Sequence, residues 1–143
     1  MDILNGVEVA QVAAEIGLFE WPTGTLAATA PETAVGIFGP GTVSAALAAI
    51  QIHPSATFAP SNSNYWFIQV WKRTAGGSAV LLASGSSASS LNNPVTFTAW
   101  AATSLVLVSG AFLSPGDVIT AAATKTGAPA NLQAYVSGFV TVN

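Results

Sequence analysis

The sequence predicts an all-β fold: an antiparallel β-sandwich preceded by a short N-terminal arm or helix. Short runs of β-branched and small apolar residues recur along the 143-residue chain, with Gly, Pro, Asn and Ser between them. One run, 65–72, is apolar on both faces when read as a strand. Only 6% of the residues are charged and 51% are hydrophobic, so folding must bury large surfaces with few ion pairs.

Residues 1–24 are predicted to form an attachment arm in front of a sandwich domain, residues 25–143. Within 5–19, apolar residues recur at helical spacing with acidic residues between them, which indicates a short amphipathic helix. The same residues also alternate, so an extended arm that adds a strand to a neighbour is the alternative. The apolar residues expected to make the attachment are Ile3, Leu4, Val9, Val12, Ile16 and Phe19.

The body of the sandwich is predicted from runs of 5 to 12 residues that turn-forming residues separate. Their regular spacing is typical of two packed antiparallel sheets. The predicted strands are 25–30, 34–38, 42–53, 64–73, 79–84, 95–101, 104–108, 117–124 and 134–142.

The strand 64–73 is the most apolar. Alternation in YWFIQVWK places Tyr65, Phe67 and Trp71 on one face, while the other face begins with Trp66. A strand that is apolar on both sides is central in a packed layer, or another subunit covers its outer face. Because the chain carries so few charges, the second arrangement is favoured.

Two loops flank the next predicted strand. Residues 75–78, AGGS, form a good hairpin loop, so 79–84 should return antiparallel to 64–73. Residues 84–93, SGSSASSLNN, are small and polar, which is typical of an exposed, mobile connection.

The distribution of charge excludes several classes of partner. Between Thr33 and Gly116 only Lys72 and Arg73 carry a formal charge, and the net charge is −3. Three basic residues are too few to neutralise a phosphate backbone, so no nucleic-acid partner is expected. No apolar run reaches the length that spans a bilayer, so no membrane partner is expected. The acidic first quarter would be either solvated or a match for a basic partner surface.

Candidate catalytic groups are scarce. His53 is the only histidine and there is no cysteine, so one chain cannot assemble a typical zinc site or a thiolate nucleophile. Five of the six carboxylates lie in the first quarter and Asp117 stands alone, so no acid/base pair is indicated. The chain is therefore expected to be no enzyme and to need no cofactor or metal.

The last forty residues contain the most specific pattern, AFLSPGDVI followed by YVSGFV. Pro115 fixes φ for a turn, Gly116 can adopt positive φ, and Asp117 can accept hydrogen bonds from backbone amides where the next strand starts. Gly138 beside Phe139 permits close backbone approach.

This pattern resembles the closing half of the trimeric jelly-roll domain of the tumour necrosis factor and complement families, and the resemblance covers roughly 64–143. It implies a jelly-roll sandwich and a homotrimer with aromatic residues near the three-fold axis. Similar modules occur in phage capsid decoration proteins and fibre heads. The residues expected between subunits are Tyr65, Phe67, Trp71, Tyr135 and Phe139.

The resemblance and the composition lead to a functional expectation: a structural protein of a phage virion that binds the major capsid protein, or another virion protein, as a homotrimer and stabilises the shell. Such a protein is made in the host cytoplasm, and the start of the chain has no signal-peptide pattern. The alternative is the receptor-binding head of a tail or head fibre. In that case Tyr65, Trp66, Trp71 and Trp100 could form a platform for sugars, although packing explains these residues more simply.

Overall fold

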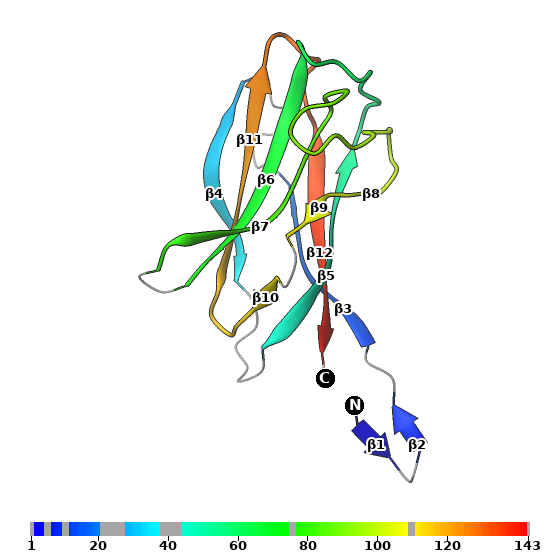
Figure 1. The fold of residues 1–143 in the computed structure, drawn as a ribbon, viewed down its shortest axis with the longest axis vertical. Helices are drawn as coiled ribbons and strands as arrows, with labels where there is room; N and C mark the ends of the chain where they lie inside the picture. Colours follow the sequence, from blue (N-terminus) through cyan, green and yellow to red (C-terminus); the bar gives the residue numbers. More distant parts are fainter. Residues whose placement is uncertain are drawn as a thin grey trace.

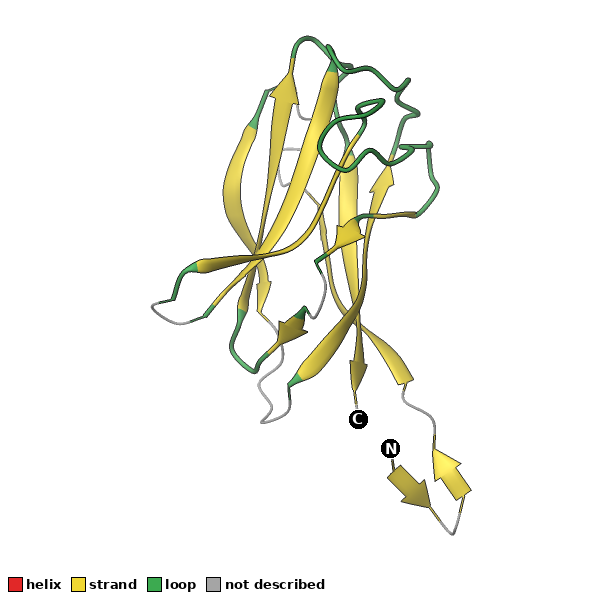
Figure 2. Cartoon of the chain, viewed as in Figure 1, coloured by secondary structure: helices red, strands yellow, loops and turns green. Residues whose placement is uncertain are grey.

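Antiparallel strands make up the regular structure of the chain. The computed structural model describes residues 2–4, 7–9, 12–20, 28–37, 44–74, 77–108 and 111–142, and it contains no helix in these ranges (Figure 2). The strands are β1 (Asp2–Leu4), β2 (Val7–Val9), β3 (Val12–Glu20), β4 (Ala30–Ile37), β5 (Ala45–Pro54), β6 (Tyr65–Arg73), β7 (Ala79–Ser86), β8 (Thr103–Ser104), β9 (Val106–Leu107), β10 (Phe112–Leu113), β11 (Val118–Thr126) and β12 (Ala134–Val142).

Two five-stranded sheets pack face to face, which confirms the predicted sandwich (Figure 1). The β5–β12 sheet has the order β10-β5-β12-β3, with β8 also paired to β5. The β6–β11 sheet has the order β4-β11-β6-β7-β9. From β3 to β12 the chain changes sheet at every connection except the one between β6 and β7. Most consecutive strands therefore lie on opposite sides of the core of an antiparallel sandwich.

The hairpin of β6 and β7 confirms the most local of the predicted pairings. Arg73 is opposite Ala79 and Phe67 is opposite Ser86, with one register shift between them. The amide of Gly77 donates to the carbonyl of Thr74 at 2.8 Å, which closes the turn. The glycine loop and the two β-rich segments are therefore sufficient to specify this pairing.

The core lies between the sheets and is filled by the inward residues of the alternating strands. Trp66, Ile68 and Val70 on β6 are at most 1% exposed, and so are Ile52 of β5 and Val136 of β12 in the facing sheet. The indole N–H of Trp66 donates to the carbonyl oxygen of residue 130 at 2.8 Å, which satisfies its polar group inside the core.

The N-terminal segment is extended, so the predicted helix is wrong. β3 pairs along β12 from Val12 opposite Val142 to Glu20 opposite Tyr135. The apolar spacing fits both periods, and pairing with a long neighbouring strand satisfies most of the backbone groups along one edge of β3, with one register shift between Gly138 and Phe139. The extended alternative is correct in shape, but here the strand pairs within its own chain. The boundary predicted at residue 24 lies outside the described residues.

The hairpin of β1 and β2 forms a small sheet of its own, with Asp2 opposite Val9. Figure 1 draws it beyond the end of the sandwich, on the side where β3 begins and β12 ends. A two-stranded hairpin with no covering layer is marginal in water. This part of the chain is therefore the least supported by its own fold.

Two further segments differ from the sequence prediction. Residues 95–101 are an irregular loop, not a strand, because Phe97 is fully buried and packs edge-on against Phe58 with ring centroids 5.9 Å apart. Half of the predicted strand 25–30, residues 25–27, lies outside the described residues, and of residues 28–30 only Ala30 is in a strand. A loop that buries one aromatic side chain in the core can have the same apolar composition as a strand, so composition alone does not distinguish the two.

The serine-rich segment 84–93 is also different from the exposed connection predicted for it. Residues 84–88 are buried, and their hydroxyls bond to backbone and side-chain partners. The hydroxyl of Ser87 accepts from the amide of Trp66 at 3.0 Å, and the Asn93 side chain donates to the hydroxyl of Ser84 at 2.8 Å. Serine is small enough to be buried where its hydroxyl is paired.

No helix in the described part of the chain is long and apolar enough to cross a membrane. In the same part, no group of three or more His, Cys, Asp or Glu residues is placed to hold a metal ion.

Candidate assembly surface

Formal charge is divided unequally between the two sheets. Among the residues whose side chains the structure describes, the charged ones are Glu32 on β4, Lys72 and Arg73 on β6, Asp117 next to β11 and Lys125 on β11. All of them belong to the β6–β11 sheet or its border. The sequences of β5, β8, β10 and β12 contain no Asp, Glu, Lys or Arg. The edge strand β3 brings the only acidic residues of the β5–β12 sheet.

One charged group lies on the outer face of the β6–β11 sheet. The guanidinium of Arg73 donates to both carboxylate oxygens of Glu32 at 2.8 and 2.7 Å, and the hydroxyl of Thr120 donates to the same carboxylate. These bonds hold the pKa of Glu32 at about 2 and raise the pKa of Arg73. The bidentate pair joins β4 to β6 across β11.

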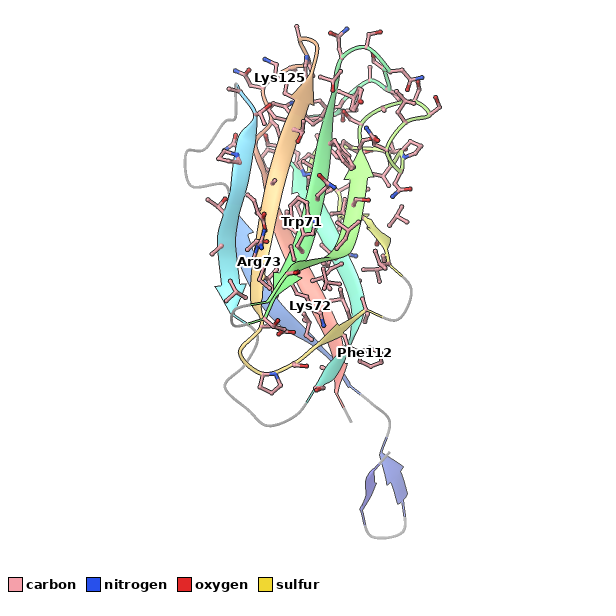
Figure 3. The ribbon with its side chains drawn as sticks, turned by 60° about the vertical axis from the view of Figure 1, so that its left-hand side comes forward. Trp71, Lys72, Arg73, Phe112 and Lys125 are labelled. Carbon is pink, nitrogen blue, oxygen red and sulfur yellow. The ribbon has the colours of Figure 1, made fainter. Side chains whose placement is uncertain are left out.

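A second charged group joins the two sheets at their lower end in Figure 3. The ammonium of Lys72 donates to the carbonyl of Phe112 at 2.6 Å and lies 3.7 Å from the carboxylate of Asp117. Asp117 is only 2% exposed and accepts from the amide of Ser114 at 2.8 Å. Gly116 has φ +85°, so the turn predicted from Ser-Pro-Gly-Asp is confirmed in detail.

The outer face of the β5–β12 sheet has a different composition. The rings of His53 and Tyr135 stack at 4.3 Å with an angle of 6° between their planes. His53 Nε2 is 3.0 Å from Ser137 Oγ, which ties β5 to β12. Ser137 is opposite Gln51, and Gln51 is also opposite Ser104 on β8, so these polar but uncharged residues share one face.

The same face continues toward the start of β5 through small residues. Ala46 and Ala49 precede Gln51 in the sequence of β5, and Ala46 is opposite Phe112 of β10. Phe112 is 53% exposed, while the next residue, Leu113, is fully buried in the core. We call this surface the neutral face. It consists of Ala46, Ala49, Gln51, His53, Ser104, Phe112, Tyr135 and Ser137.

The contact of His53 with Ser137 has the spacing of a base and a nucleophile. Ser137 is 3% exposed, however, and it lies in the middle of a paired strand. A substrate carbonyl could not approach its hydroxyl without displacing the stacked rings. We interpret this contact as a structural link between two strands.

The predicted subunit-interface residues do not come together. Tyr65, Phe67 and Trp71 lie on β6, whereas Tyr135 lies on β12 in the opposite sheet. Tyr65 is 7% exposed, and the Asn92 side chain donates to its hydroxyl at 3.1 Å, so its own chain covers it. Phe67 and Trp71 are half-buried. The backbone of Phe139 is opposite Ala49, but its side chain lies outside the described residues.

The predicted attachment residues are also divided. Ile3, Leu4 and Val9 are in the small hairpin of β1 and β2, where Ile3 is opposite Glu8. Val12, Ile16 and Phe19 are in β3, a strand of the sandwich, and Phe19 is opposite the buried Val136. The side chains of all six lie outside the described residues. Only the three hairpin residues are on a segment apart from the sandwich.

The four residues considered as a sugar platform are separated in the same way. Trp66 and Tyr65 are buried and Trp71 is half-buried on β6. Trp100, in contrast, is 81% exposed in the loop before β8. Packing therefore explains three of them, and Trp100 requires another explanation.

His53 and Phe112 were missed as members of an assembly surface. The signal that could have found them is the absence of charge from four of the five strands of one sheet, but this requires the sheet order, which one sequence does not provide. No protein-family model matches the chain, and no curated protein or solved structure matches it either.

Proposed function

We propose that this chain is a non-enzymatic structural subunit that assembles as a homotrimer through the neutral face. The observation that carries the proposal is the unequal division of charge between the two sheets. Tyr135 and Phe112 expose 40% and 53% of their surfaces on a face with no formal charge on β5, β8, β10 or β12. Depletion of charge and exposed aromatic rings are typical of the centre of a protein interface.

A three-fold arrangement fits one neutral face better than it fits all of the interface residues predicted from sequence. In a closed ring of three subunits, each subunit contacts both of its neighbours. Its two contact patches lie next to each other on the side of the subunit that faces the three-fold axis. Patches on opposite sheets of a sandwich face away from each other, so Trp71 and Tyr135 cannot both face the axis. Three neutral faces turned toward one axis would each contact both neighbours.

We further propose that the trimer decorates the shell of a virus particle and stabilises it by binding the major capsid protein or another virion protein. The antiparallel sandwich and the resemblance to trimeric jelly-roll domains support this role. The hairpin of β1 and β2, which carries Ile3, Leu4 and Val9, is the segment proposed to contact the shell, because it has no covering layer of its own.

The test compares two glutamines at the centres of the two outer faces. Gln51 lies on the neutral face and Gln69 lies on β6, and both are half-buried. The mass of the wild-type chain in solution, measured by light scattering after size-exclusion chromatography, is expected to be three times that of the monomer. Gln51→Lys places three like charges at the contact and is expected to give monomers, whereas Gln69→Lys remains trimeric.

A monomeric wild-type chain at micromolar concentration would exclude assembly through this surface. Dissociation of Gln69→Lys but not of Gln51→Lys would move the contact to the other sheet. The shell-binding role is tested separately by co-sedimentation of the wild-type trimer with empty phage shells. Trimers that stay in the supernatant with every shell tested contradict decoration and leave the assembly proposal intact.

The head of a receptor-binding fibre is the second candidate, and Trp100 is the observation that favours it. A ring that is 81% exposed costs solubility and contributes nothing to the core. A fibre head would present such a ring to a receptor.

A further inference from the structure

Trp100 is the most exposed large apolar residue among those whose side chains the structure describes. It is 81% exposed, while the other exposed large apolar side chains are at most 53% exposed. Its φ is +61°, in the left-handed region. A bulky residue in this region is an outlier that costs about 1–2 kcal/mol. Trp100 therefore combines an unfavourable backbone conformation with an exposed indole.

The surrounding loop holds Trp100 in a defined place. The amide of Trp100 donates to the carbonyl of Pro54 at 2.8 Å, and the amide of Ala99 donates to the hydroxyl of Thr57 at 3.0 Å. Three residues earlier, Phe97 is fully buried and accepts, through its carbonyl, from the amide of Phe58 at 2.9 Å. The loop is thus fixed at the exposed ring and in the residues before it, so a ligand would not have to order this part of the loop.

The neighbouring loops contain hydroxyl and amide groups but no charge. Residues 55–64, 94–102 and 127–133 include no Asp, Glu, Lys, Arg or His. The hydroxyl of Ser55 donates to the side-chain oxygen of Gln133 at 3.4 Å, beside the point where Trp100 bonds Pro54. Figure 1 shows these loops together at the end of the sandwich away from the small hairpin. A ligand suited to this end has a flat apolar face and neutral polar groups at its rim.

We propose that Trp100 is the stacking platform of a binding site for neutral carbohydrate. The C–H face of a pyranose ring can lie on the exposed indole, while its hydroxyls bond to the hydroxyl and amide groups of Ser55, Thr57 and Gln133. Trp100 is 81% exposed and its neighbours in sequence, Ala99 and Ala101, are small, so the indole is open to a ligand. A protein partner is less well matched, because tryptophans that dominate protein interfaces lie in packed pockets surrounded by other contacts.

The test uses the full chain and a panel of neutral oligosaccharides that contain glucose, galactose or N-acetylglucosamine. Binding is measured by saturation-transfer NMR and by quenching of tryptophan fluorescence. Trp100→Ala is expected to lower affinity about ten-fold or more, the loss of one aromatic stacking contact. Trp100→Gly removes the same ring, so it is expected to weaken binding at least as much, while keeping or raising the melting temperature because glycine adopts positive φ without strain.

Val80→Ala is the matched control, since Val80 is 49% exposed on β7 opposite Lys72, at the other end of the sandwich. It is expected to bind sugar as the wild type does. No binding of the wild type to any oligosaccharide in the panel would overturn the proposal, and so would unchanged binding by Trp100→Gly. Loss of trimers or of shell binding in Trp100→Gly, without sugar binding by the wild type, would assign the ring to a protein contact instead. Sugar binding does not depend on the trimer, so each proposal can fail alone.

Discussion

The two sheets of the sandwich share one pattern of alternation but differ in what they present to the outside. The β6–β11 sheet carries Glu32 and Arg73 as a bidentate pair on its outer face, and Lys72 and Asp117 at its border. The neutral face of the β5–β12 sheet carries no formal charge on four of its five strands. Every charged side chain that the structure describes therefore lies on or beside the β6–β11 sheet, while the acidic residues of β3, Glu15 and Glu20, are opposite Phe139 and Tyr135 at the edge of the other sheet. Depletion of charge is typical of the centre of an interface, which is the role we propose for the neutral face.

The largest expected effect comes from the buried carboxylate between the sheets. Asp117→Ala removes the partner of Lys72 and leaves the amide of Ser114 without its acceptor, so the free energy of unfolding should fall by about 3 kcal/mol. Urea denaturation followed by tryptophan fluorescence measures this loss. Thr124→Ala, at an exposed position on β11, is the control and should change stability by less than about 0.5 kcal/mol. Equal stability of the two variants would contradict a structural role for this charge.

The turn from β10 to β11, which carries the chain from one sheet to the other, should be the next most sensitive. Gly116 has φ +85°, and no atom lies within 4 Å of the position that a Cβ would occupy. Gly116→Ala should therefore destabilise through backbone strain alone, by about 1.5 kcal/mol, and thermal unfolding measures it. A neutral result would mean that the turn adapts its conformation.

The ion pair on the outer face should make stability depend on pH. The pKa of Glu32 is about 2 in the folded chain, below its ordinary value of 4.5, so its contribution to stability is complete above pH 4.5 and is lost as the pH falls toward 2. Because both side chains are partly exposed, solvent screens the pair and we expect its contribution to stability to be small. The difference in stability between wild type and Glu32→Gln should shrink from pH 7 to pH 3. A constant difference would show that the pair contributes nothing.

The smallest expected effect concerns salt. The eight residues that define the neutral face carry no formal charge, so raising NaCl from about 0.05 M to about 0.5 M should change the trimer dissociation constant by less than about three-fold. Sedimentation equilibrium measures this constant. A loss of trimers at high salt would place the contact on charged groups and reverse the comparison between the sheets.

Local signals in the sequence were sufficient for several elements. The glycine loop after Arg73 and the turn at Gly116 each depend on a few neighbouring residues, and both are confirmed. The helix predicted in 5–19 was wrong because a short apolar segment satisfies both periods, and only pairing with β12 decides between them. The strand predicted at 95–101 was wrong because these residues form an irregular loop, from which the buried side chain of Phe97 packs against Phe58.

The candidate surface was harder to predict than the strands. Tyr135 was chosen for its place in the last strand, and it does lie on the neutral face. Trp71 was chosen from the alternation of β6. Alternation identifies the two faces of a strand, but it does not show which other strands lie in the same sheet and share its outer face. That assignment depends on pairings between segments about 80 to 130 residues apart, namely β12 with β5 and with β3. Single-sequence patterns carry little information at that range.

The antiparallel pairing of β3 with β12 defines two distinct ends of the sandwich. Val12 and Val142 are opposite each other at one end, and Tyr135 is opposite Glu20 at the other, about 25 Å away for strands of this length. A peptide fused to the end of β12 would therefore emerge beside the small hairpin. A peptide inserted at the exposed residues 89–92 would be displayed from the same end as Trp100. The two ends of the sandwich could thus each display a different peptide.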